Sequence, residues 1–213
     1  MMNIVYQVKN AIYVNLTNRC PCACRFCLRQ NAPGVYGSDS LWLEREPSAQ
    51  EVMDELSKWD LDKYPEVVFC GYGEPTERLD TLLEVGKWLK SKHPTLPIRI
   101  NTNGLADLIA GQPTAPRLAG IIDKLSISLN SADAKEYLEL CRPSFGEAAY
   151  PAMLNFAQEA AKYVPDVVMT IVGSPVTTPE VQTRCQALVD ELGIRLRIRP
   201  YEGAYNAHKK TMV

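Results

Sequence analysis

The chain has 213 residues and a net charge of −2, and 46% of its residues are hydrophobic and 23% charged. These values are typical of one globular domain with a complete hydrophobic core. The small negative net charge creates no overall positive potential that would attract nucleic acid. No apolar run has the length of a membrane span or follows a basic start as in a signal peptide, so we expect a cytoplasmic protein without membrane contact. We expect a single domain over residues 1–213, with a core over about 11–200 and a C-terminal tail over 201–213.

Strand and helix patterns alternate along the chain. Residues 3–8 and 11–16 read as two strands joined by a tight turn, with the first as an edge hairpin strand. Further strands are predicted at 66–70, 97–102, 124–130, 167–172 and 195–199. Helices are predicted at about 48–59, from 77, at 132–141, at 147–163 and from 178. The alternation predicts parallel β/α construction, and its six units fit either a doubly wound sheet or an open six-stranded partial barrel.

Four cysteines lie within eight residues, directly after the strand at 11–16. They are Cys20, Cys22, Cys24 and Cys27. Thiolates converging from one loop at the carboxyl end of a strand point to zinc or an iron–sulfur cluster. Zinc sites favour two C-x2-C pairs on separate arms, and no second pair exists here. The spacing of Cys20, Cys24 and Cys27 lets a tight loop turn three sulfurs around one cluster and leaves one iron without a thiolate. The alternatives are a zinc knuckle that uses all four cysteines and a disulfide pair, and a chain without a secretion signal argues against the disulfide.

This stretch resembles the C-x3-C-x-aromatic-C signature of the radical SAM superfamily, with Phe26 as the aromatic residue. The preceding residues 15–19, Asn-Leu-Thr-Asn-Arg, resemble the opening of the same superfamily. The resemblance implies a 4Fe–4S cluster on Cys20, Cys24 and Cys27, whose open iron binds the amino and carboxylate groups of S-adenosylmethionine (SAM). It also implies an open partial (β/α)6 TIM-like barrel with mostly parallel strands, and it gives Cys22 no ligand role.

A second motif, Gly71-Tyr72-Gly73-Glu74-Pro75, follows the strand at 66–70 and resembles the GGE motif of the superfamily. A strand-end peptide group and a carboxylate can accept hydrogen bonds from the methionine ammonium of SAM, and glycines let the backbone approach it closely. Tyr72 stands where the second glycine is usual. The alternative is a plain glycine turn before a helix.

Polar residues at the later strand ends match positions where superfamily members contact SAM. The resemblance assigns Asn101 and Asn103, Ser128 and Asn130, and Val172 to this role. The alternative is that these residues only stabilise the turns at the strand ends, where asparagine is favoured.

Several strands alternate between polar and apolar residues, although strands buried on both faces are usually continuously apolar. Arg99 and Asn101 share one face of their strand, and Arg195, Arg197 and Arg199 share one face of the last. We therefore expect a polar lumen that binds an anionic substrate, with Arg199 closest to substrate or SAM. An exposed edge strand with solvated arginines is the alternative for the last strand.

The resemblance implies an enzyme that cleaves SAM to a 5′-deoxyadenosyl radical, which then abstracts hydrogen from a substrate in the barrel. It implies a reduced flavodoxin- or ferredoxin-type electron donor, and no catalytic acid or base is evident. In length and opening motif the chain is most similar to the small TatD-linked radical SAM proteins, which would make a TatD-type hydrolase a partner. The alternatives are a glycyl-radical-enzyme activase acting on a protein, or a non-catalytic zinc or iron–sulfur binding module.

Overall fold

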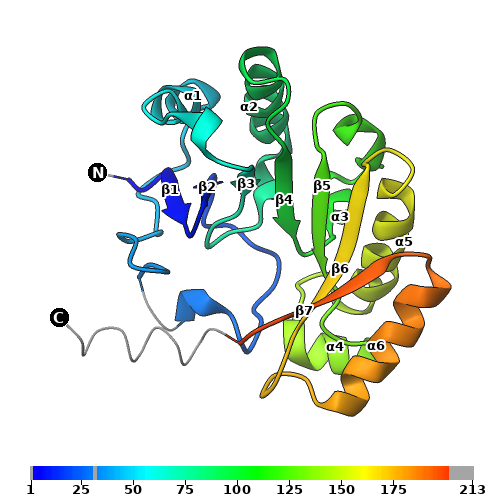
Figure 1. Ribbon diagram of the computed structural model, residues 1–213. Coiled ribbons are helices and arrows are strands. Elements are labelled where there is room, and N and C mark those ends of the chain that lie inside the picture. Colours follow the sequence, from blue (N-terminus) through cyan, green and yellow to red (C-terminus); the bar gives the residue numbers. More distant parts are fainter. Residues whose placement is uncertain (1, 31–32, 202–213) are drawn as a thin grey trace.

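Seven strands form one open, mostly parallel sheet in the computed structural model, which describes residues 2–30 and 33–201 (Figure 1). They are β1 (Val5–Val8), β2 (Ala11–Val14), β3 (Val67–Phe69), β4 (Ile98–Thr102), β5 (Lys124–Ser128), β6 (Asp166–Val172) and β7 (Arg195–Arg199), and they lie side by side in chain order. Only β1 and β2 pair antiparallel within the described chain. This arrangement confirms the predicted open barrel of six parallel strands with an N-terminal hairpin strand. The tail predicted from residue 201 lies almost wholly outside the described residues.

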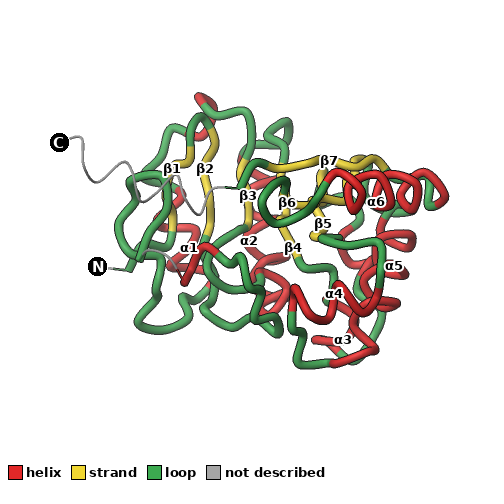
Figure 2. The backbone as a smooth tube through the Cα atoms, turned by 90° about the horizontal axis from the view of Figure 1, so that it is seen from below, coloured by secondary structure: helices red, strands yellow, loops and turns green. Residues whose placement is uncertain are grey.

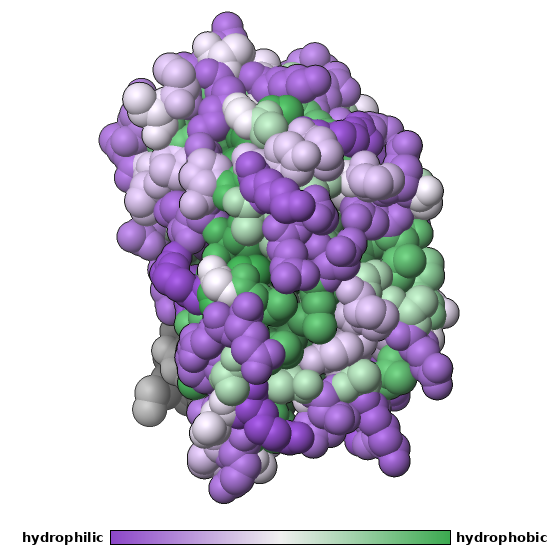
Figure 3. Space-filling view, turned by 90° about the vertical axis from the view of Figure 1, so that its right-hand side faces the viewer, coloured by the Kyte–Doolittle hydropathy of each residue, from purple (hydrophilic) through white to green (hydrophobic). Residues whose placement is uncertain are grey.

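The helices connect consecutive strands and cover one face of the curved sheet (Figures 1 and 2). They are α1 (Ala49–Leu56), α2 (Leu79–Lys92), α3 (Ala106–Ala110), α4 (Ala134–Cys141), α5 (Ala149–Ala160) and α6 (Pro179–Glu191). Short 3-10 turns occur as η1 (Leu28–Gln30), η2 (Leu61–Lys63), η3 (Pro75–Arg78), η4 (Ala115–Leu118) and η5 (Gly146–Ala148). A capping box formed by Ser48 and Glu51 opens α1, and Thr178 caps α6 ahead of Pro179. The side of the molecule that is on the right in Figure 1 shows mainly hydrophilic residues around an apolar area (Figure 3).

The alternation of polar and apolar residues in the strands separates the two faces of the sheet. Ile12, Val14, Ile98, Ile100 and Leu125 are fully buried in the main core against the helices. The residues between them, including Arg99, Asn101 and Ser126, point to the concave face, as the period of two requires. The concave face is therefore polar at its centre, as predicted.

A second, smaller apolar cluster lies on the concave side at the β1–β2 end of the sheet. It comprises Tyr6, Val8, Val35, Leu41 and Tyr72. Because Val35 and Leu41 come from the long segment after the cysteine loop, this cluster holds residues 33–43 against the sheet. We call this segment the lid.

Candidate active site

The cysteine loop lies at the carboxyl end of β2 and is held by the end of α4. Backbone hydrogen bonds tie the two segments together, among them Ala23 N–H to the Cys141 carbonyl at 3.0 Å, Arg25 N–H to the Leu140 carbonyl at 3.0 Å, and Ser144 N–H to the Pro21 carbonyl at 2.7 Å. The last carbonyls of a helix have no partner within the helix, so those of Leu140 and Cys141 are free to accept the bonds from Ala23 and Arg25. The end of α4 thereby fixes the path of the cysteine loop.

The sulfur atoms of this region form a connected group that includes a fifth cysteine, Cys141. Cys22 hydrogen-bonds the sulfurs of Cys20 and Cys24, and Cys141 bonds Cys24. These contacts lower the pKa of Cys20 and Cys24 and raise the pKa of Cys22 and Cys141. Cys27 belongs to the same loop, and burial raises its pKa. The pattern divides the group into hydrogen-bond acceptors, Cys20 and Cys24, in which the iron-binding thiolate is favoured, and hydrogen-bond donors, Cys22 and Cys141.

Cys141 has no neighbouring cysteine in the sequence. It is 2% exposed at the last residue of α4, and the Asn130 amide donates to its sulfur at 3.3 Å. Its place at a helix end opposite the cysteine loop depends on tertiary packing, and no local sequence signal marks it. Within the described ranges no three Cys, His, Asp or Glu side chains converge closely enough to hold a single metal ion.

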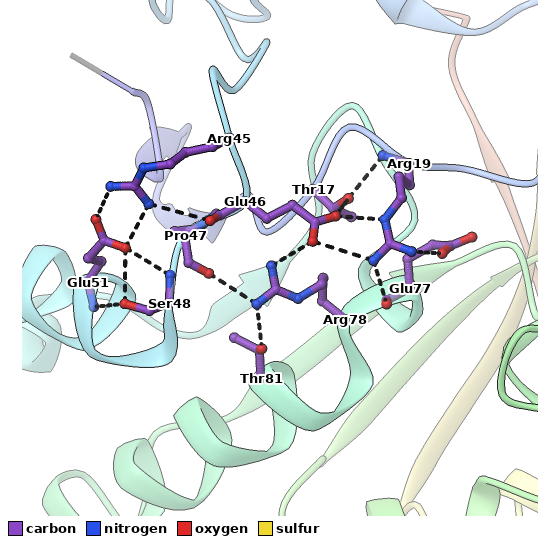
Figure 4. A network of polar contacts seen from close by, with 10 residues as sticks. All are labelled: Thr17, Arg19, Arg45, Glu46, Pro47, Ser48, Glu51, Glu77, Arg78 and Thr81. Atoms are coloured by element: carbon purple, nitrogen blue, oxygen red, sulfur yellow. Dashed lines mark hydrogen bonds and ion pairs between the residues drawn. The ribbon is translucent and has the colours of Figure 1, made fainter.

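A network of charges holds the loop entrance against α1 and α2 (Figure 4). The Glu46 carboxylate accepts hydrogen bonds from Thr17 Oγ1 and Arg19 Nε, both at 2.7 Å, and from Arg78 Nη1 at 2.9 Å. Arg19 also pairs with Glu77 at 2.9 Å. Burial opposes ionisation of Glu46, but the bonds from Arg19 and Thr17 and the nearby positive charges lower its pKa overall. One carboxylate thus joins the strand-end loop, the segment before α1 and the start of α2.

The Gly71–Glu74 turn packs against this same loop entrance. A Cβ added at Gly73 would lie 2.3 Å from the Thr17 carbonyl oxygen and 2.6 Å from that of Arg19. A Cβ at Gly71 would lie 2.0 Å from Asn15 Oδ1. The glycines are therefore required by close contact with the chain leading into the cysteine loop. The sequence predicts either a close approach of the backbone to SAM or a plain glycine turn, and neither prediction includes this contact with the loop entrance.

Glu74 is 3% exposed and has hydrogen-bond partners for both carboxylate oxygens. Oε1 accepts from Thr76 N at 3.1 Å, Thr76 Oγ1 at 2.8 Å and Thr102 Oγ1 at 2.7 Å, and Oε2 accepts from Asn103 N at 2.7 Å. Burial raises its pKa, and these bonds act in the opposite direction. The carboxylate joins the ends of β3 and β4, and Oε2 keeps a free lone pair for a ligand donor.

Tyr72, the residue that replaces a family glycine, belongs to the lid cluster. Its ring packs edge-on against Trp42 at a centroid distance of 5.3 Å. The Asn15 amide donates to the Leu41 carbonyl at 2.7 Å, so the lid is also bonded to the end of β2. Burial, together with the charge of Cys27, raises the pKa of Tyr72 to about 12. The departure from the family pattern is thus linked to the anchoring of the lid.

The other predicted cofactor residues lie at neighbouring strand ends on the same edge of the sheet. Asn103 follows β4, and its amide nitrogen is 3.9 Å from the Cys20 sulfur and 3.8 Å from that of Cys22. Asn130 follows β5, Val172 ends β6 and Arg199 ends β7 beside it. Ser128 ends β5, and Asn101 accepts from Arg99 at 2.9 Å. Phe26 is half-buried and belongs to neither apolar cluster, so its ring is available to a ligand.

The lumen arginines differ in their partners. Arg99 pairs with Glu66 at 2.7 Å, and Arg195 pairs with Asp166 at the rim. Arg197 donates to Ser126 Oγ at 2.8 Å but has no carboxylate partner among the described residues. Burial and the charges of Arg99 and Arg199 lower its pKa. Arg195 and Arg197 are both exposed, as the edge-strand alternative predicts, whereas Arg199 is half-buried.

Unpartnered polar atoms support a ligand at these strand ends. Across residues 2–30 and 33–201, four buried side-chain polar atoms lack a hydrogen bond: Asn15 Oδ1, Asn130 Oδ1, Arg199 Nε and Tyr150 Oη. The first three lie at the carboxyl ends of β2, β5 and β7. Buried polar groups are rarely left without partners, because each costs about 1–3 kcal/mol. The surplus of polar atoms next to the cysteine group fits a polar cofactor such as SAM beside a cluster.

Comparison with known proteins agrees with this geometry. The family model described as "Radical SAM superfamily" matches residues 14–184. The comparison with curated proteins found no match. Among solved structures, "Native anSMEcpe with bound AdoMet" is similar with a TM-score of 0.61 and 17% identity, over 89% of this chain and 50% of that one.

Two further structures show the same fold. Methylornithine synthase (PylB) has a TM-score of 0.59 and 14% identity, over 90% of this chain and 53% of that one. HydG, a maturase of the FeFe-hydrogenase, has a TM-score of 0.61 and 14% identity, over 90% of this chain and 42% of that one. The chain thus spans about half the length of these structures.

The match to the family covers both signature motifs and most of the barrel. No helix among the described residues is long and apolar enough to span a membrane. The chain therefore belongs to the radical SAM superfamily, whose enzymes use a 4Fe–4S cluster and SAM.

Proposed function

We propose that this enzyme abstracts hydrogen from a substrate that carries a carboxylate or phosphate group. When bound, the cofactors supply the 5′-deoxyadenosyl radical, formed when one electron from the cluster cleaves SAM. The residues of the chain hold the cofactors and orient the substrate beside them. The single observation that carries the proposal is the pair of arginines, Arg197 and Arg199, that face the lumen without a carboxylate partner in the described chain.

The cofactor assignments follow the geometry of the strand ends. Cys20, Cys24 and Cys27 would hold the cluster through three thiolates. The remaining residues that we assign to SAM are Phe26, Gly71, Tyr72, Gly73, Glu74, Asn101, Asn103, Ser128, Asn130, Val172 and Arg199. Asn130 and Arg199 are supported most directly, because each has a buried atom without a partner. Tyr72 and Gly73 act through packing, since their contacts are with the lid and the loop entrance.

The anionic substrate follows from charge balance in the lumen. Glu66 accepts from Arg99 and, at 3.2 Å, from Lys124, so its negative charge is already shared between two cations. Arg197 and Arg199 face the same side of the sheet, near Arg99, and guanidinium groups stay charged in proteins. Cations brought together are costly unless an anion compensates them. The SAM carboxylate can compensate one arginine, and the substrate anion is proposed to compensate the other.

We further propose a place for the protein among small TatD-linked radical SAM proteins, with a TatD-type hydrolase as a partner. The support is the opening Asn-Leu-Thr-Asn-Arg-Cys-Pro-Cys at residues 15–22. All seven cysteines are free thiols, which suits the reducing cytoplasm. A reduced flavodoxin- or ferredoxin-type protein is the proposed source of the electron.

Two measurements test the proposed function. Anaerobically reconstituted and reduced protein should release 5′-deoxyadenosine slowly from SAM without substrate, and the absence of any release contradicts the proposal. Inorganic phosphate should raise the melting temperature of the reconstituted protein with SAM, and Arg199→Met should weaken this effect. The loss expected for one charged hydrogen bond is about 1.5–3 kcal/mol. Arg195→Met is the matched control, because Arg195 is on the same strand but 73% exposed and paired with Asp166. Equal effects of the two substitutions contradict an anion site at Arg199.

A further inference from the structure

Cys141 contacts a predicted cluster ligand from outside the cysteine loop. It is the last residue of α4 and is 2% exposed, and its side chain hydrogen-bonds the Cys24 sulfur. The proposed function gives Cys141 no role, since three thiolates of the loop already hold the cluster. The loop alone cannot place this thiol, so its position must come from the packing of α4.

The backbone on both sides of Cys24 is bonded to the end of α4. Ala23 N–H donates to the Cys141 carbonyl at 3.0 Å, and Arg25 N–H donates to the Leu140 carbonyl at 3.0 Å. Since both neighbours of Cys24 are held in this way, the Cys24 sulfur stays next to the sulfur of Cys141.

The opposite end of α4 is anchored as well. The Asp133 side chain caps the helix by accepting from Glu136 N–H at 2.9 Å. The Glu136 carboxylate accepts from Ser131 Oγ at 2.6 Å and from Arg184 Nη2 at 2.7 Å, which ties the first turn to the segment after β5 and to α6. With both ends held, the helix gives Cys141 a fixed position that the cysteine loop must meet.

Asn130 sets the direction of the Cys141 thiol. Asn130 is 2% exposed, and its amide nitrogen donates to the Cys141 sulfur at 3.3 Å. The sulfur accepts a hydrogen bond on this side, so its own S–H is directed to the acceptor that remains, the sulfur of Cys24. A buried thiol beside a thiolate keeps its proton, because a second negative charge there would be both repelled and poorly solvated. Asn130, Cys141 and Cys24 therefore form a chain of hydrogen bonds that ends on a ligand sulfur.

We propose that Cys141 is a positioning residue that donates its S–H to the Cys24 ligand sulfur and thereby raises the reduction potential of the cluster. This inference rests on the proposed function, because it takes Cys24 as a cluster ligand. Reduction adds one negative charge, which the cluster shares with its ligand sulfurs. A hydrogen bond to a ligand sulfur stabilises the more negative form, so it makes the cluster easier to reduce.

Two other roles for Cys141 predict different behaviour. As a fourth ligand, Cys141 would occupy the iron that SAM requires, and its removal would cost iron. As a packing residue alone, it would affect stability without affecting the potential. The contact with Cys24 favours the donor role over the ligand role, because two thiolates in direct contact would repel each other.

The test is the midpoint potential of the reconstituted cluster, titrated anaerobically with dithionite and followed by electron paramagnetic resonance without SAM or substrate. Cys141→Ala removes the donor but keeps the backbone carbonyl that Ala23 needs. This variant should keep about four irons per chain and make the cluster about tenfold harder to reduce, a shift of about −59 mV. Cys141→Ser keeps a small donor and should restore most of this shift.

Cys185→Ala is the matched control, because it removes the same atom from a fully buried cysteine on α6. Its potential should equal that of the unchanged protein. Cys141→Val fills the site without a donor, so it should give the same shift as Cys141→Ala even if the cavity left by alanine lowers the melting temperature. An unchanged potential in the variants without a donor overturns the proposal, and so does an equal shift in Cys185→Ala.

Iron content separates the donor role from the ligand role. If the Cys141 variants lose as much iron as Cys24→Ser, Cys141 is a ligand and the proposal is overturned. Failure of the proposed function is distinguishable, because it would appear as no release of 5′-deoxyadenosine from SAM. The midpoint potential is measured without SAM, so it reports on Cys141 whatever the outcome of that assay.

Discussion

The four thiols of the cysteine loop differ in their surroundings, although they are chemically identical. Cys22 is 5% exposed and hydrogen-bonded to two neighbouring sulfurs, whereas Cys20, Cys24 and Cys27 are partly exposed. A cysteine that binds the cluster must present its sulfur to iron. A cysteine that only donates hydrogen bonds to the ligand sulfurs, as Cys22 does, can be replaced by another small hydrogen-bond donor. The different environments give each cysteine a distinct expected response to substitution.

Serine at Cys20, Cys24 or Cys27 should remove most of the roughly four irons that the reconstituted chain binds, because a hydroxyl is a poor substitute for a thiolate ligand. Serine at Cys22 should leave the iron content close to that of the unchanged protein. Iron analysis and the absorbance spectrum of each variant measure the outcome. Cys185→Ser, at a fully buried position on α6, controls for the cost of a buried hydroxyl. Equal loss at all four loop cysteines would instead favour a four-cysteine site.

Gly73 contacts the cysteine loop entrance closely enough that any side chain must displace backbone. Gly73→Ala should therefore lower both stability and iron content, by several kcal/mol for stability if the backbone cannot move. Gly111→Ala is the control, because a Cβ there meets nothing within 4 Å and only the positive φ of 66° is strained. That strain costs about 1–2 kcal/mol and should leave the iron content unchanged. Thermal melting and iron analysis distinguish the two, and a Gly73→Ala protein with full iron content contradicts the packing role.

At the scale of elements, Glu46 connects three segments that are far apart in the sequence. Its side chain is 35% exposed, so solvent weakens each of its ion pairs. Glu46→Gln should destabilise the protein by about 1–2 kcal/mol near neutral pH, because Arg19 and Arg78 lose a charged acceptor. Arg45→Gln, at an ion pair that is exposed on both sides, should cost less and serves as the control.

The stabilisation that Glu46 provides should depend on pH. The folded-state pKa of Glu46 is lowered from its ordinary value of 4.5, so its contribution is complete above that pH. As the pH falls through the lower folded pKa, the carboxylate is protonated and the contribution disappears. The melting temperatures of the unchanged protein and of Glu46→Gln should therefore converge on the acid side of pH 4.5. If the two melting temperatures differ by a constant amount down to the lowest pH at which the protein folds, this assignment is contradicted.

The strands, helices and faces of the sheet could be predicted because each follows a local pattern. The period of two in residues 195–199, for example, is visible in the sequence, and so is the capping box of α1. The pairing of Arg195 with Asp166 and the packing of Gly73 on Thr17 depend on which strands and loops become neighbours. Cys141 is the clearest case, because its helix end meets the cysteine loop across more than a hundred residues of chain. Sequence patterns therefore located the site, and tertiary contacts decided which residues complete it.

At the scale of the whole molecule, the sheet has a different apolar cluster on each face. The main core lies between the sheet and all the helices, while the lid cluster lies on the concave face at the β1–β2 end. The lid cluster has only five buried members, and its lid residues contribute no strand to the sheet. Regions with few buried apolar contacts open locally before the whole domain unfolds. The lid and the main core should therefore behave as two cooperative units.

Hydrogen exchange measured by mass spectrometry tests this division. Leu41→Ala removes a side chain that is 1% exposed in the lid cluster, and Leu56→Ala removes one that is fully buried in the main core. Both substitutions delete the same atoms, which typically costs 2–5 kcal/mol, roughly the same range at either site. Leu41→Ala should speed exchange in residues 33–43 and leave β4 to β6 unchanged, because the lid can open without the sheet. Leu56→Ala should speed exchange in β4 to β6 as well, since the main core is shared by all the helices. Equal acceleration of β4 to β6 by both variants would show that the lid and the core unfold as one unit.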